Sequence, residues 1–543
     1  MYNIRNATSE IKHARFQLLT LAFLLTFCGS QTAVGQGAPA MWGDLAPGPY
    51  PVGFRTVFTY DLSRPSVPYS DWDGRLYPTD EQPGRQMQIN IWYPADIAAA
   101  DQKLAFGDYL DLMARQTDFG PIDDSKRRFA NEQFISKTNA LGGNGTFTQK
   151  KLDTLSNLET AAYNDPRPVR EKFPLIVFPN GGSPAFQSIM SEFFASHGFV
   201  VAAGALKGQY GMTEDISVKG FETAVDDLGF LVNEVLEIEQ ADPERICLIG
   251  NAITASQIVA YQSRNARIDC LVSLDGGLLS RFDQSILRRT AYYDAQEVNK
   301  PILAIYAPHP SIDPQNIDHL KFSRRFLFHF PQMSEFYFLN YGAFEKLVPG
   351  IIGEPKGDVE TGFRLAAMYC LRFLEAFLQG SRDSERFLSQ KPTAALSEHI
   401  DKAEVKESLP SPPNATVVKD GFLTQGIAYI EDVYEALKKE NPTPFAHSFY
   451  SDLKDWLAYK RDPKFENRYQ LYQLALDSYP DSATVNYYLA YFALETGRRE
   501  VSKRLNRKTL ELLDNDTSAE LTQERKAEMR EYILQDLKTL DQE

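Results

Sequence analysis

The residues around Gly250 have the spacing of a turn that presents a catalytic serine. A short apolar run at 245–250 (RICLIG) is followed by a helical pattern that begins near Thr254. In the frame Gly-x-Ser-x-Gly, the serine sits on a sharp strand-to-helix turn and attacks an ester carbonyl. Here the frame reads Gly-Asn-Ala-Ile-Thr, with Ala252 at its centre. Alanine has no lone pair with which to attack a carbonyl. The sequence therefore has the turn that would carry a nucleophile, but it lacks the serine hydroxyl.

The elements that would position this turn are strands buried on both faces. From residue 174 onward, near-continuous apolar runs alternate with amphipathic helical patterns, which is typical of a parallel sheet covered by helices. The predicted strands are PLIVFPNGG, FVVAAGA, RICLIG, CLVSLDGG, PILAIYA and, at 335–342, EFYFLNYG. The predicted fold class is therefore α/β, a mostly parallel sheet with helices on both faces.

The segments that precede this pattern have a different character. In QMQINIWYPA (86–95), apolar side chains alternate with polar ones, which predicts a half-buried antiparallel strand. Residues 103–165 are polar and charged with helical runs, and we expect them to form a helical insertion that lies over the sheet.

Three stretches of residues 41–378 carry a resemblance to a known family. They are GPYPVGFRTVFTYDLSR, the segment FPLIVFPNGG with FASHGFVVAA after it, and VSLDGG. In these stretches the chain resembles the α/β-hydrolases related to platelet-activating-factor acetylhydrolase and dienelactone hydrolase. The helical C-terminal extension is also similar to one carried by some secreted bacterial members.

The resemblance implies a triad in the chain order serine, acid, histidine. Ala252 stands at the nucleophile position, and Asp275 in SLDGG stands at the acid position, although an aspartate before two glycines is also a common turn residue. Family members place the histidine in a His-x-x-Phe context, whereas this chain has Tyr341-Gly-Ala-Phe344. A tyrosine, with an ordinary pKa of about 10, is a poor general base at neutral pH.

The resemblance also implies an oxyanion loop that follows the first parallel strand. Asn180, Gly181 and Gly182 replace the usual His-Gly start of this loop, and the backbone of Ile253 would supply the second donor. The backbone N–H groups could still bind a carbonyl oxygen or an anion, and the alternative is a vestigial turn that binds nothing.

Other residues offer few substitutes for the missing groups. His309, just beyond PILAIYA, is the candidate for a relocated base, and its alternative is a solvent-exposed loop residue. Ser256 lies one helical turn beyond Ala252, where its side chain would point along the helix. Ser183 is expected to cap a helix.

The N-terminus is typical of an export signal. Basic residues precede an apolar run of ten residues at 18–27, and small residues follow at 33–35. We predict a signal peptide over 1–35, a mature chain that begins at Gln36, and a periplasmic or extracellular location; an uncleaved membrane anchor is the alternative. No later stretch is apolar for long enough to span a membrane.

The remaining chain of 543 residues divides into two predicted domains. Residues 36–385 would form the α/β-hydrolase domain, and 386–425, with the proline-rich SLPSPP, a linker. Residues 426–543 are predicted to be helical. The 34-residue spacing between Leu476 and Leu510 favours tetratricopeptide-like helix pairs, with a generic helical bundle as the alternative.

Composition and motifs limit the functions that we expect. A net charge of −15 excludes a basic nucleic-acid surface, and the sequence lacks a Cys/His cluster for a metal, so we expect neither metal nor cofactor. The sequence therefore predicts a pseudo-hydrolase that binds an ester-like or acyl ligand in a vestigial pocket, or a protein partner through the C-terminal helices. The alternative is an active carboxylic-ester or lactone hydrolase that uses Asp275 with a water molecule or with His309.

Overall fold

The computed structural model describes the chain from residue 38 to residue 542 with short gaps. The described ranges are 38–66, 83–116, 118–179, 183–209, 215–459, 465–516 and 521–542, together with the backbone of the two short strands β2 (Tyr69–Ser70) and β3 (Leu76–Tyr77). The predicted signal peptide lies outside the described residues. None of the described helices combines the length and the apolar character that a bilayer span requires.

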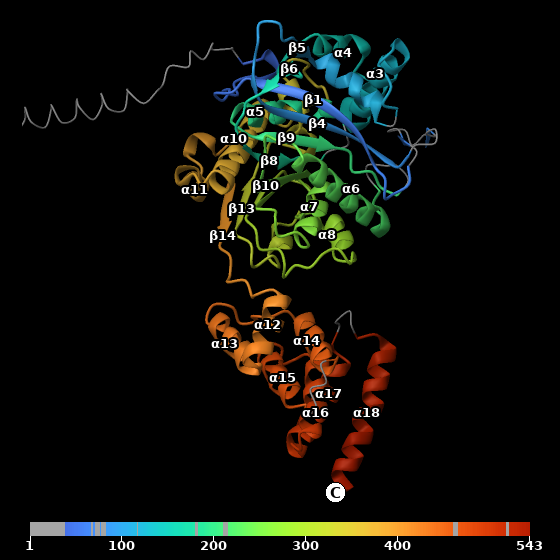
Figure 1. The fold of residues 1–543 in the computed structure, drawn as a ribbon, viewed down its shortest axis with the longest axis vertical. Helices are drawn as coiled ribbons and strands as arrows, with labels where there is room; N and C mark the ends of the chain where they lie inside the picture. Colours follow the sequence, from blue (N-terminus) through green and yellow to red (C-terminus); the bar gives the residue numbers. More distant parts are fainter. Residues whose placement is uncertain are drawn as a thin grey trace, which may run out of the picture.

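Among the described residues, a 12-stranded sheet forms the centre of the larger part of the molecule (Figure 1). Its central strands lie in the order β1 (Val52–Asp61), β4 (Arg85–Asp96), β9 (Val200–Gly204), β8 (Phe173–Val177), β10 (Ala241–Asn251), β11 (Cys270–Leu274), β12 (Ile302–Tyr306) and β13 (Arg325–His329). From β9 to β13 all pairings are parallel, and β4 runs antiparallel to both of its neighbours. The antiparallel second strand and the exchanged positions of β8 and β9 are the strand arrangement of the α/β-hydrolase fold, so the predicted fold class is confirmed.

Helices cover both faces of this sheet, and each face has its own apolar core. On one face lie α5 (Ser188–Ser196), α9 (Asn340–Phe344) and α10 (Val359–Leu378), and on the other α6 (Val218–Leu236), α7 (Ile253–Gln262) and α8 (Arg281–Leu287). The parallel strands β8, β9 and β11 are buried along their whole length because both of their faces are covered.

The predicted half-buried strand is β4, and the prediction of its exposure is wrong. Every residue from Arg85 to Ala95 is buried. The apolar side chains pack in the core with α6, while the polar face, which includes Gln86 and Asn90, is covered as well. Partners on that face satisfy polar groups of the strand: Lys207 Nζ donates to Gln86 O over 3.4 Å, and Thr56 Oγ1 donates to Asn90 Oδ1 over 3.2 Å.

The segment 103–165 is helical in its middle but begins and ends as sheet. Its helices are α2 (Phe106–Asp111), α3 (Asp124–Thr138) and α4 (Gln149–Ser156). Its end strands β5 (Lys103–Ala105) and β6 (Glu159–Asn164) pair with each other, and β6 pairs with β1. The insertion therefore extends the edge of the sheet as well as covering a face.

Two other assignments from the sequence differ from the structure. Residues 335–342, predicted as the last strand, form the short helices η6 (Glu335–Phe338) and α9, and the strand is β13, ten residues earlier. Short aromatic runs do not distinguish a strand from a buried helix by periodicity alone. In the predicted linker 386–425, residues Lys402–Lys406 form β14, which pairs antiparallel with β13.

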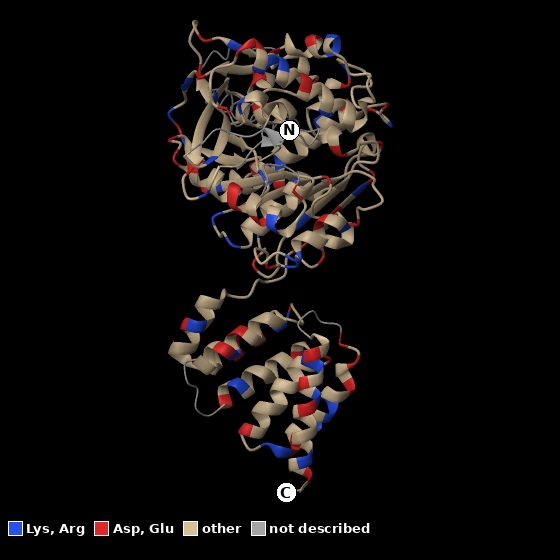
Figure 2. Ribbon diagram, turned by 90° about the vertical axis from the view of Figure 1, so that its right-hand side faces the viewer, with Lys and Arg blue, Asp and Glu red and all other residues tan. Residues whose placement is uncertain are grey.

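The C-terminal part is a separate helical body joined to the first by the chain after β14 (Figures 1 and 2). Its helices are α12 (Ala415–Gln425), α13 (Ile427–Lys438), α14 (His447–Tyr459), α15 (Glu466–Ser478), α16 (Ala483–Glu495), α17 (Arg499–Leu513) and α18 (Gln523–Gln542). It has its own apolar core. Lys321 links the two bodies by donating to Thr443 Oγ1 over 2.8 Å and to Asn441 Oδ1 over 3.2 Å.

Candidate functional site

The carboxyl ends of β10 and β11 bring two of the predicted site residues together. The two strands pair in parallel up to Asn251 and Leu274, so Ala252 and Asp275 leave the sheet side by side. The N–H of Ala252 points at the backbone carbonyls of Leu274, 3.3 Å away, and Asp275, 3.2 Å away. The turn at Ala252 thus contacts the backbone of Asp275 directly.

The backbone of Ala252 has the conformation of a strained strand-to-helix turn. Its φ is 50° and its ψ is −134°, a region that side chains rarely occupy. A Cβ on Gly250 would lie 2.5 Å from the backbone of Ala255, so this first frame position accepts only glycine. The turn is therefore tightly packed at the place that the sequence frame indicates.

Small residues allow the acid-bearing loop to pack against this turn. A Cβ on Gly277 would lie 2.4 Å from the Cβ of Ala255 and 2.5 Å from the carbonyl oxygen of Ala252. Asp275, Gly276 and Gly277 all have positive φ. The loop and the turn are therefore held as one unit by close backbone contact.

Asp275 is buried and makes its hydrogen bonds to the backbone. Its Oδ1 accepts the N–H of Ala307 over 2.9 Å. Burial raises the pKa of Asp275 to about 6, against the opposing effects of the N–H groups of Ala307 and Gly276 and of the nearby His309 and His329. The carboxyl is thus ionised above about pH 6, and no histidine hydrogen bond to it is found among the described residues.

Tyr341 belongs to an aromatic cluster. It lies in α9, fully buried, at 6.2 Å from the ring of Phe134 and 6.1 Å from that of Phe186. Its hydroxyl is 3.0 Å from Thr138 Oγ1, on the insertion helix α3. Burial raises the pKa of Tyr341 further above its ordinary value, so this phenol holds its proton and cannot act as a general base.

The position of α9 is held by the residue before Tyr341. Asn340 Oδ1 accepts the N–H of Ile189 over 3.1 Å, and its Nδ2 donates to Ala185 O over 2.8 Å and to Ser188 Oγ over 2.9 Å. These bonds tie α9 to the start of α5, next to the segment that follows the oxyanion loop. The structure thus places Tyr341 beside that segment, and its hydroxyl pairs with Thr138 rather than with Asp275.

The predicted oxyanion loop is described only at its edges. Asn180, Gly181 and Gly182 lie outside the described residues, and Ile253 is the first residue of α7. Ser183 caps the short helix η4 (Pro184–Phe186), because its Oγ accepts the N–H of Ala185 over 3.2 Å.

The histidine proposed as a relocated base faces the solvent. His309 is exposed, and its Nδ1 is 2.7 Å from Ser311 Oγ in the same loop. Ser256 is fully buried in α7 and offers no accessible hydroxyl.

Sequence reasoning missed a histidine–aspartate pair at the end of β13. His329 Nδ1 is 2.5 Å from Asp401 Oδ1, and the His329 ring packs 4.9 Å from the ring of Tyr306. A histidine oriented by a carboxylate has the arrangement of a general base. The run RFLFH is the sequence signal for this strand, but the pattern favours a last strand at 335–342, and it places Asp401 in the predicted linker. Within the described ranges, no group of three or more His, Cys, Asp or Glu side chains could hold a metal ion.

No protein-family model and no curated protein matches this sequence. Among solved structures, the chain is similar to a ferulic acid esterase from Streptomyces cinnamoneus, with 19% sequence identity and a TM-score of 0.45. The alignment covers 67% of this chain and 98% of the esterase chain.

Proposed function

We propose that this chain is an exported α/β-hydrolase homologue that lacks serine-hydrolase activity and acts by binding a ligand or a protein. One observation carries the proposal: the strained turn at Ala252 keeps the backbone of a nucleophile elbow but presents only a methyl group. Without nucleophile and base, an elbow of this kind is left with oxyanion stabilisation and substrate binding, which alone give only slow turnover.

The surroundings of Tyr341 support the same proposal. Its ring packs against Phe134 and Phe186, its hydroxyl is 3.0 Å from Thr138 Oγ1, and burial keeps the phenol protonated, so it cannot serve as a base. A serine restored at position 252 would therefore still lack a base.

The alternative function is hydrolysis of a carboxylic ester or lactone by non-standard groups. The pair His329–Asp401 favours it, because His329 lies close enough to Asp275 to lower the pKa of that carboxyl. A water molecule activated by His329 would then replace the serine as nucleophile.

Ester turnover by four proteins separates the two functions. We propose to assay the full chain, Ala252→Ser, His329→Gln and Asp275→Asn with short-chain p-nitrophenyl esters and a fluorophosphonate probe, beside a competent serine esterase as positive control. The pseudo-hydrolase predicts background turnover and no labelling for all four. Turnover by the wild type that Ala252→Ser leaves unchanged and His329→Gln abolishes would establish the alternative.

Export is tested separately from catalysis. N-terminal sequencing of protein recovered outside the cytoplasm should begin at Gln36. Recovery of the chain only with its first 35 residues attached would contradict a cleaved signal peptide.

A further inference from the structure

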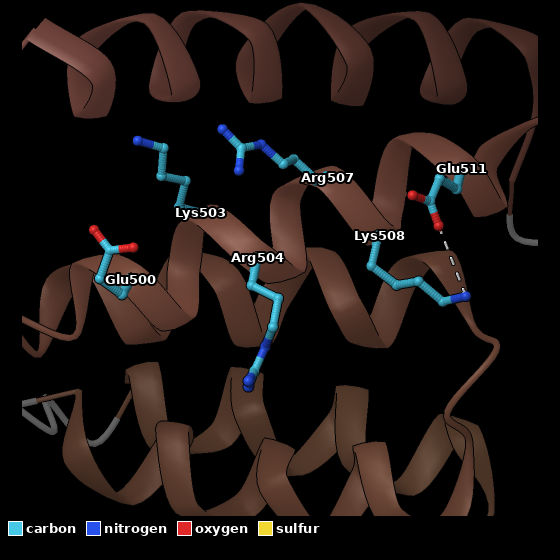
Figure 3. Close-up of a pocket in the computed structure, with 6 residues that line it drawn as sticks. All are labelled: Glu500, Lys503, Arg504, Arg507, Lys508 and Glu511. Atoms are coloured by element: carbon cyan, nitrogen blue, oxygen red, sulfur yellow. Dashed lines mark ion pairs between the residues drawn. The ribbon is translucent and has the colours of Figure 1, made fainter.

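The outward face of α17 gathers four cations in a chain that is acidic overall. Ser502, Leu505, Asn506, Thr509 and Leu513 face inward and are buried. The opposite face carries Lys503, Arg504, Arg507 and Lys508, with Glu500 and Glu511 at its two ends. These six side chains line a cavity of about 320 Å³ (Figure 3).

A carboxylate already binds to this face. Asp541, near the end of α18, forms an ion pair with Lys503 Nζ, and its Oδ1 is 3.8 Å from Arg507 Nη2. Asp541 is half-exposed, so solvent screens this contact and makes it weak enough for another anion to replace it. Lys508 pairs with Glu511 over 3.9 Å (Figure 3). Within the described part of the chain, Arg504 makes no ion pair, and its side chain extends away from Lys503 and Arg507, where an incoming anion could reach it (Figure 3).

The spacing of the charges limits the anion to a short one. Lys503 and Lys508 are about 7.5 Å apart along the helix axis, and Glu500 and Glu511 are about 16 Å apart, at 1.5 Å per residue. A long polyanion that continued past either end would meet a glutamate and be repelled. An extended peptide places the side chains of residues i and i+2 on one face about 6.7 Å apart, which matches the spread of the cations.

The carboxylate of Asp541 indicates which anion this face binds. A planar guanidinium donates two parallel N–H bonds to a carboxylate or to a phosphate, so the two arginines alone do not decide between them. Asp541 is a carboxylate at this face in the structure itself.

We propose that the α17 face binds a short acidic peptide segment with carboxylates on alternate residues, and that the carboxylate of Asp541 competes with this peptide for the same cations. This inference deepens the binding role in the proposed function and rests on it. The ester assays above test the catalytic part of the proposed function, and the peptide-binding assay below tests this inference, so each can fail independently of the other.

Fluorescence anisotropy of labelled peptides on the full chain tests the proposal. The probe is fluorescein-Gly-Glu-Gly-Glu-Gly-Glu, and the control is the same labelled peptide with Gln in place of each Glu, which lacks only the side-chain carboxylates. We expect the acidic probe to bind in low salt, and Arg504→Glu combined with Arg507→Glu to weaken binding by about tenfold or more, since two ion pairs are reversed. Asp541→Asn should tighten binding by about two- to fivefold, because it removes the competing carboxylate.

The matched control is Lys439→Glu, which makes the charge change of one of the two Arg→Glu substitutions at an exposed site just after α13. It should leave binding within twofold of the wild type, and far-ultraviolet circular dichroism should be unchanged for every variant. Weakening by Lys439→Glu as large as that by the combined arginine variant, binding that Asp541→Asn does not tighten, or capture of inorganic polyphosphate in preference to the peptide would each overturn the proposal.

Discussion

Replacement of Ala252 by glycine should stabilise the protein. The φ of 50° and ψ of −134° at Ala252 place its Cβ in a region that costs a non-glycine residue about 1–3 kcal/mol. Glycine removes this cost but adds about 0.4–1 kcal/mol of conformational entropy to the unfolded chain. Because Ala252 is only half-buried, the lost methyl contact is small. We expect a net gain of about 1 kcal/mol in the free energy of unfolding.

The assay is urea unfolding of the full chain followed by tryptophan fluorescence. Trp42 and Trp92 are buried in the α/β part and report its transition, which must be fitted separately from that of the helical body. The matched control is Ala255→Gly, three residues along. Ala255 is fully buried and helical, so glycine there should cost about 1 kcal/mol or more.

A third variant sharpens the comparison. Ala252→Val should destabilise the α/β part by about 2 kcal/mol or more, because a β-branched side chain fits a positive φ worst. The reasoning would be refuted by a loss of stability in Ala252→Gly as large as that in Ala255→Gly. Such a result would mean that the turn is relaxed and that the frame is not a nucleophile elbow.

Three further perturbations follow from buried polar groups. Thr138→Val leaves the hydroxyl of Tyr341 without its partner and should lower the free energy of unfolding in urea by about 1–3 kcal/mol. Adding Tyr341→Phe should recover part of this loss. If the effects of the two substitutions were fully additive, the two side chains would not interact. Glu192 is fully buried, and burial raises its pKa to about 7. Its contribution to the free energy of unfolding is therefore complete below about pH 4.5 and is lost as the pH rises to about 7. Glu192→Gln should reduce this change in the free energy of unfolding by up to about 3 kcal/mol, and urea midpoints from pH 4.5 to 8 that keep the wild-type slope would contradict the prediction. Burial lowers the pKa of His319 to about 4. Its contribution to the free energy of unfolding is therefore present above about pH 6.5 and is lost as the pH falls toward 4. In a pH titration, His319→Gln should unfold less readily with acid than the wild type, and unchanged acid sensitivity would argue against a buried neutral histidine.

The parts of the fold that could be predicted from the sequence are those with purely local signals. The strands β8, β9 and β11 are short, continuous and apolar because helices cover both of their faces, and the sequence shows this directly. By contrast, β14 is a charged edge strand, Lys402–Lys406, in which only Ala403 and Val405 pack against the core. Its pattern resembles a linker, and only the pairing with β13 makes it a strand.

The site shows the same division between local and distant signals. The positions of Ala252 and Asp275 could be predicted, because each follows a strand that the sequence marks clearly. The partner of Tyr341 could not, because Thr138 is 203 residues away on an insertion helix. The pair His329–Asp401 was missed because it joins one misassigned strand to a segment predicted as a linker.

Asp275 shows why an aspartate at a predicted acid position is weak support for activity. In a working triad, a carboxylate oxygen accepts the N–H of the histidine. Here Oδ1 accepts the N–H of Ala307 and the carboxylate also accepts that of Gly276, so the side chain joins the loop after β11 to the loop after β12. That structural role requires a buried carboxyl whether or not a reaction takes place. Asp275 therefore does not discriminate between an enzyme and a binding scaffold, whereas Tyr341, whose buried hydroxyl is bonded to Thr138 of the insertion, cannot supply a general base.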